Sequence, residues 1–204
     1  MISALFVERG GCYFGLYPEI DPWDITRDAR LYEGPNPVIA HPPCQRWGRF
    51  SDGSPLKKTY TTGDDDGCFE SALASLKKWG GVLEHPSNSK AWGVFGIQTP
   101  AKCGWTWDES HGLWVCQVEQ GHYGHVARKS TWLLVKGSLP PELRWGPAPQ
   151  RIPQKRLEER GRASAVRCGM VAYQSKNQRQ RTPLAFRDLL IEIVRAVVPT
   201  EVEV

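Results

Sequence analysis

The stretch Pro37-Val38-Ile39-Ala40-His41-Pro42-Pro43-Cys44-Gln45 decides the fold. Residues 37–41 form a short apolar run between turn-forming residues, a pattern typical of a strand that is buried on both faces of a parallel sheet. Pro42 and Pro43 end this strand because neither proline has a backbone N–H to donate to a neighbouring strand. Cys44 is therefore expected at the carboxyl edge of a sheet, where open α/β sheets bind their ligands.

The segments on both sides of this strand predict an α/β domain. Residues 2–8 predict a first strand, which Gly10-Gly11 end. Apolar residues at helical spacing predict a helix that ends at Gly80-Gly81; they are Phe69, Ala72, Leu73 and Leu76. Further strands are expected at residues 82–84, 113–118 and 131–135. The order strand, loop, helix, strand indicates a doubly wound sheet.

The last third of the chain differs in composition from the rest. Residues 137–181 are rich in Pro, Gly, Arg and Gln without a clear period, which predicts an irregular or partly helical basic arm. A final helix is expected to begin with Thr182 as N-cap and Pro183 at the first helical position. We expect residues 1–136 to form the α/β domain, and residues 137–204 to form the arm and a helix that packs back on it.

Charge and length limit the class of protein. A chain of 204 residues has room for one sizeable core, and no apolar run approaches the roughly 20 residues of a membrane span. The start shows no export signal, so the cytoplasm is the expected compartment, that of a bacterial host if the gene belongs to a phage. Residues 144–195 carry twelve Lys or Arg against four Asp or Glu, within a chain of net charge +4. This basic third favours a phosphate-bearing partner, although a solvated surface of mixed charge is the alternative.

Cys44 is the first candidate for chemistry. The two prolines stiffen its loop, and a cysteine is the best side-chain nucleophile near neutral pH because some thiolate is already present. His41, Arg46 and Arg49 lie close in the sequence and would favour that thiolate. The alternative is a small buried cysteine after a strand.

Glu84 is the second candidate, since it ends the strand expected at residues 82–84 and would face the same crevice as Cys44. Burial would raise the pKa of this carboxyl group and allow it to share a proton with a base. A glutamate that caps the following turn is the alternative. A metal site is not expected, because the spacing of the nearby His and Cys residues matches no zinc-finger pattern; they are Cys103, His111, Cys116, His122 and His125.

In this order, the Pro-Pro-Cys-Gln turn, a helix, a strand and Glu84 resemble the DNA cytosine-5 methyltransferases. The chain is similar to shortened members common in phage and prophage genomes, with a His-Pro-Pro-Cys turn and a Tyr-Gly-His block. The resemblance implies an enzyme with a Rossmann-like sheet of the methyltransferase type, in which Cys44 attacks C6 of a flipped pyrimidine and Glu84 contacts N3. His41 or His85 would move protons. The stretch 123–131 is similar to the family's Tyr-Gly-x-Pro-Gln-x-Arg-x-Arg, which implies that Arg128 and Lys129 steady the base or its phosphate.

The resemblance also implies a place for S-adenosylmethionine. Phe6 with Gly10 and Gly11 is similar to the family's cofactor strand and glycine turn, and Asp24 to the acidic residue of its Gly-Asp-Ile segment. The intervening residues 12–23 are fewer than the about 30 of a βαβ unit, so the cofactor half is shortened. Two alternatives therefore stay open: a non-methylating enzyme that modifies a base or nucleotide without S-adenosylmethionine, and a catalytically silent DNA-binding protein.

DNA is the partner that the resemblance and the basic third both indicate, with a free pyrimidine nucleotide as the alternative. Basic residues near Cys44 and before the final helix are the candidate phosphate contacts; they are Arg46, Arg49, Lys176, Arg179 and Arg181. A charged surface before an amphipathic helix is the competing interpretation.

Overall fold

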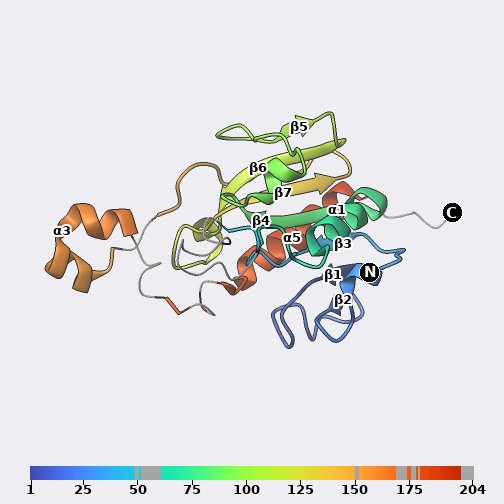
Figure 1. The fold of residues 1–204 in the computed structure, drawn as a ribbon, viewed down its shortest axis with the longest axis horizontal. Coiled ribbons are helices and arrows are strands. Elements are labelled where there is room, and N and C mark those ends of the chain that lie inside the picture. The colour runs from blue at the N-terminus through green and yellow to red at the C-terminus, as the bar shows by residue number, and fades with distance from the viewer. Residues whose placement is uncertain are drawn as a thin grey trace.

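The described residues form one mixed sheet with helices on both faces (Figure 1). The computed structural model describes residues 1–48, 51, 61–149, 152–168, 174–175, 178 and 180–198. The strands are β1 (Ile2–Leu5), β2 (Ile20–Trp23), β3 (Val38–Ala40), β4 (Gly81–Pro86), β5 (Thr106–Asp108), β6 (Leu113–Glu119) and β7 (Ser130–Lys136). The helices are α1 (Cys68–Trp79), α2 (Ala91–Val94), α3 (Gln154–Cys168) and α5 (Leu184–Val197), with 3-10 turns at Ala29–Leu31 and Gln120–Tyr123.

The strand order across the sheet is β2-β1-β3-β4-β7-β6-β5. The first four strands in this order run parallel, while β7, β6 and β5 continue the sheet in antiparallel pairs. The predicted α/β class is confirmed, and the parallel half is compatible with a Rossmann-like fold. From β1 the chain passes to β2 on one side, and from β3 it passes to β4 on the other. The carboxyl ends of β1 and β3 therefore flank a topological switch point, where open α/β sheets form a crevice.

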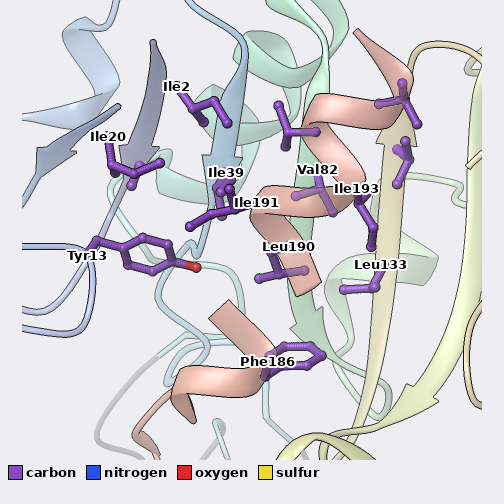
Figure 2. Close-up of a cluster of buried hydrophobic side chains, with 14 of the residues drawn as sticks. Ile2, Tyr13, Ile20, Ile39, Val82, Leu133, Phe186, Leu190, Ile191 and Ile193 are labelled. Atoms are coloured by element: carbon purple, nitrogen blue, oxygen red, sulfur yellow. The ribbon is translucent and has the colours of Figure 1, made fainter. Parts of the chain in front are cut away.

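Alternation along the strands divides the apolar core between two faces of the sheet. On one face, Ile39 and Val82 pack with Phe186 and Leu190 of α5, as Figure 2 shows. On the other face, Phe69 and further apolar residues of α1 pack against Val38, Ala40 and Leu83. The final helix thus packs back on the sheet as predicted, and the short β3 contributes to both layers.

The elements around the sheet differ in detail from the sequence predictions. All five predicted strands and both predicted helices are present, with bounds that shift by a few residues. The final helix begins one residue later than expected, because Pro183 has extended backbone angles and takes the N-cap position predicted for Thr182. The short strands β2 and β5 were not predicted. Inside the predicted arm, α3 lies beyond the end of the sheet in Figure 1 and is interrupted at Gly161. Within the described ranges, no helix has the length and apolarity that crossing a membrane requires.

Candidate active site

A cavity of about 1600 Å³ opens at the carboxyl edge of the parallel strands. Its wall comes from the loops after β1 and β3, the end of β4, the turn before β7 and the approach to α5. These are residues 6–13, 41–45, 84–86, 88, 124–126, 129, 174, 178 and 180–184. The structure therefore places both main candidates, Cys44 and Glu84, at one cavity, as expected from the positions of their strands.

The loop that carries Cys44 is fixed at both of its ends. At its start, the His41 backbone N–H donates to Leu5 O at 3.0 Å, which ties the loop to β1. At its end, the Trp47 N–H donates to Cys44 O at 3.1 Å. The buried Trp47 indole in turn donates to Asp65 Oδ2 at 2.7 Å. Cys44 is half-buried at the cavity wall, so its sulfur is held in a defined place.

Glu84 receives hydrogen bonds at both carboxylate oxygens. Oε2 lies 3.1 Å from His41 Nδ1, while Oε1 accepts from Gln120 Nε2 and from Thr131 Oγ1, each at 3.1 Å. Gln120 Nε2 also lies 3.0 Å from Thr131 Oγ1, so the two donors support each other. The carboxylate is therefore held by three side chains from the β3 loop, the turn after β6 and β7.

The protonation state of Glu84 differs from the sequence expectation. Burial acts to raise its pKa, but the hydrogen bond and charge of His41, followed by the charges of Lys129 and His85, outweigh burial and lower the pKa to about 2. Glu84 is thus ionised at neutral pH, and the predicted rise of its pKa is wrong. The reason is that the buried carboxylate accepts a hydrogen bond from His41 and feels the charge of Lys129, and both favour the charged form.

His41 connects Glu84 to a residue that the sequence did not single out. Tyr13 Oη lies 2.8 Å from His41 Nε2, and the two rings are tilted with centroids 5.5 Å apart. Burial raises the pKa of the Tyr13 phenol well above its usual range, so the phenol keeps its proton. The ionised Glu84 carboxylate can only accept, so Nδ1 carries the proton of that contact. In the neutral imidazole, Nε2 then accepts from the Tyr13 hydroxyl.

His85 lies apart from this hydrogen-bonded group. Although it borders the cavity, its ring is fully buried and packs edge-on against Phe69 and Trp92. Burial lowers the pKa of His85 to about 4, with Glu84 acting in the opposite direction. The ring is neutral at physiological pH and forms part of the aromatic core beneath the site.

The two basic candidates before β7 point to different places. Lys129 lines the cavity, and its Nζ donates to the backbone carbonyl of Arg181 at 3.3 Å. Burial lowers the pKa of Lys129, while the charges of Glu84 and Cys44 act to raise it. Arg128 is outside the cavity wall, where its Nε donates to Ala148 O at 3.1 Å.

The residues proposed for S-adenosylmethionine are only partly brought together. Phe6, Gly10 and Gly11 line the cavity, beside the switch point. Asp24 does not; its Oδ1 accepts from the backbone N–H and the hydroxyl of Thr26 at 2.8 and 2.6 Å, which lowers its pKa. Asp24, the acidic residue that the resemblance assigns to the cofactor, therefore lies outside the cavity wall.

The candidate phosphate contacts also separate. Arg181 lines the cavity, whereas the partly buried Arg46 is not part of its wall. Arg49, Lys176 and Arg179 lie outside the described residues. No cluster of three His, Cys, Asp or Glu side chains suited to a metal ion occurs in the part of the chain that the structure describes.

Sequence reasoning missed Tyr13, Gln120 and Thr131, the three side chains that complete the group around His41 and Glu84. Each is a single residue in a different segment, and no spacing marks them as a set. One signal was available for Thr131, a polar residue at the start of an otherwise apolar strand. Neither a protein-family model nor a curated protein sequence matches this chain.

Proposed function

We propose that the protein is a DNA pyrimidine-C5 modifying enzyme, in which Cys44 adds to C6 of the base. The observation that carries the proposal is the common cavity of Cys44, Glu84 and Lys129 at the carboxyl edge of the sheet. Cys44 and the ionised Glu84 carboxylate come from two different segments and meet at one cavity, and Lys129 lines the same wall. This arrangement supplies the groups that addition to an electron-poor ring requires.

The chemistry follows from the electronic structure of the pyrimidine. C5 is a poor nucleophile until a thiolate adds at C6 and shifts the ring electrons to C5. The charges of Cys44 and Lys129 act on each other, so the ammonium group would attract a Cys44 thiolate. The ring nitrogen N3 takes up a proton from solvent water as the adduct forms and returns it when the sulfur leaves, and Glu84 would accept a hydrogen bond from the protonated N3. A carboxylate has about four acceptor positions, of which the described donors use three, so one remains for the base.

The size of the cavity supports a nucleotide substrate. Typical small-molecule sites enclose about 300–1,000 Å³, and this cavity exceeds that range. It has room for a base together with its sugar and phosphate, which suits a base that has left the stack of a DNA strand. Arg181 at the rim and the basic composition of residues 144–195 suit the phosphates.

The test is a covalent adduct between the protein and DNA. Single-stranded oligonucleotides that contain 5-azacytosine, and others that contain 5-fluorocytosine with S-adenosylmethionine present, are incubated with the full chain and analysed by intact mass. The wild-type protein is expected to form an adduct on at least the first, and Cys44→Ala to form none. Cys12→Ala, which removes another cysteine of the same cavity wall, is the matched control and keeps the adduct. DNA binding without any wild-type adduct would contradict the proposal and indicate a catalytically silent DNA-binding protein.

A second candidate keeps the thiolate addition but dispenses with S-adenosylmethionine. The position of Asp24, engaged with Thr26 and outside the cavity wall, favours it. Calorimetric titration of the protein–DNA complex with S-adenosylmethionine separates the two candidates. Saturable binding with an adduct on both oligonucleotides supports a methyltransferase, while an adduct on 5-azacytosine without binding supports a non-methylating enzyme.

A further inference from the structure

Both ring nitrogens of His41 are engaged inside the protein. Nδ1 faces Glu84 Oε2 at 3.1 Å, and Nε2 accepts from Tyr13 Oη at 2.8 Å. A substrate in the cavity therefore cannot bond to the imidazole without displacing one of these partners. Tyr13 lines the same cavity as His41, and its oxygen keeps acceptor capacity after donating its own proton.

We propose that Tyr13 is a catalytic residue that removes the C5 hydrogen of the base, with His41 and Glu84 behind it as a proton relay. This inference rests on the proposed function, because it assigns a step to the adduct that Cys44 forms. The arrangement follows the general rule that an activated hydroxyl lies within hydrogen-bond reach of a base, which a third group orients. Here the hydroxyl, the base and the orienting carboxylate are Tyr13, His41 and Glu84.

The surroundings of Tyr13 fix its hydroxyl in place. Its ring is 2% exposed and lies beside Ile20 and Ile39 at one side of the apolar cluster (Figure 2). The preceding residue is tied to the final helix, because Arg187 Nη1 donates to Cys12 O at 2.8 Å. A buried, packed ring loses little further freedom when it reacts, which suits a group that must meet one atom of a substrate.

Exchange of the C5 hydrogen with solvent requires no methyl donor. The Cys44 thiolate adds to C6, and a solvent proton adds to C5 from the open side of the cavity. Tyr13 Oη then takes the original C5 hydrogen as a proton, while its own hydroxyl proton passes to His41 Nε2. The electrons of the C5–H bond restore the C5=C6 double bond, and the electrons of the C6–S bond return to the sulfur. The His41 imidazolium is stabilised by the Glu84 carboxylate, so no free phenolate has to accumulate in the apolar surroundings.

Exchange of the C5 hydrogen with solvent measures this step directly. A single-stranded deoxycytidine oligonucleotide is incubated with the full chain in D2O, and loss of the H5 signal is followed by proton NMR. Tyr13→Phe is expected to slow the exchange by about 10²-fold or more, the usual contribution of a general base. The same variant is expected to keep the adduct with 5-azacytosine DNA, because Tyr13 acts only after Cys44 has added to the base. Tyr123→Phe, a half-buried tyrosine outside the cavity wall, is the matched control and exchanges at the wild-type rate.

A second variant separates a relay from a structural role. His41→Gln is expected to slow the exchange about as much as Tyr13→Phe, and the double variant is expected to be no slower, because both residues serve one proton path. Additive losses in the double variant would overturn the relay. Wild-type exchange rates in Tyr13→Phe, or a wild-type adduct without any exchange, would overturn the role of Tyr13 while the proposed function stands. Absence of the wild-type adduct overturns the proposed function itself.

Discussion

His41 Nδ1 lies 3.1 Å from Glu84 Oε2, although 43 residues separate the two side chains in the sequence. Parallel pairing of β3 with β4 explains the contact, because Ala40 lies opposite Leu83 and the next residue of each strand follows in step. The pair is therefore a direct product of strand register. Its hydrogen-bond partners and the close packing around it lead to four predictions.

Glu84→Gln removes the charge that orients His41 while it preserves the size of the side chain. We expect the free energy of unfolding to fall by about 3 kcal/mol, since three donors lose the charged group that accepts from them. We also expect C5 hydrogen exchange to slow by about 10²-fold, because His41 loses its anchor. Urea unfolding and the NMR exchange assay measure the two effects, and an unchanged exchange rate would contradict a role for Glu84 behind His41.

Thr131→Val takes one donor from Glu84 Oε1 without changing the shape of the side chain. Loss of the Thr131 donor to the Glu84 carboxylate is expected to lower the free energy of unfolding by about 1–3 kcal/mol. Thr131→Ser keeps the hydroxyl and should recover most of this loss. Urea unfolding of the three proteins at neutral pH checks the order of stability, and a Thr131→Val protein as stable as the wild type would contradict the role of the hydroxyl.

His85→Phe should make the protein more tolerant of acid. The folded-state pKa of His85, about 4, lies below the unfolded value of about 6.5. The unfolded state therefore binds the proton more tightly, and stability present above pH 6.5 is lost as the pH falls towards 4, by about 3 kcal/mol in total. Phenylalanine preserves the contacts with Phe69 and Trp92 but cannot titrate. Unfolding free energies measured between pH 7 and pH 4 should fall less steeply for this variant than for the wild type. His122→Asn removes a partly exposed histidine and is the control. The prediction is contradicted if the unfolding free energy of His85→Phe falls with pH as steeply as that of the wild type.

Gly81→Ala tests the strand pairing that brings the site together. Gly81 has φ +112, and a Cβ there would lie 2.0 Å from Val38 O. Strain and clash together are expected to cost at least about 3 kcal/mol and to loosen the β3–β4 pair. Gly93→Ala places a methyl group in open space on α2 and should leave stability unchanged or slightly higher. Thermal unfolding compares the two variants, and a Gly81→Ala protein as stable as the wild type would contradict the close approach.

Local sequence patterns predicted most of the strands and helices. Apolar runs with clear punctuation, such as residues 37–41 before Pro42-Pro43, predicted their strands because burial and proline chemistry act over a few residues. The sequence did not predict β2 and β5, because these strands are short and pairing with β1 and β6 stabilises their extended conformation. The N-cap of α5 moved from Thr182 to Pro183, a difference that only the backbone path could decide.

The sequence by itself determined that Cys44 follows one buried strand and that Glu84 belongs to another, since hydrophobic runs and the residues that interrupt them are local features of the sequence. The structure extends the second strand two residues beyond Glu84, to Pro86. Only the tertiary structure decided that Glu84 is ionised, that Tyr13 joins His41, and that Arg128 and Asp24 lie off the cavity. The physical reason is that a side chain's charge and partners depend on groups from distant segments. Strand pairing and packing bring these groups together, and no short stretch of sequence contains them.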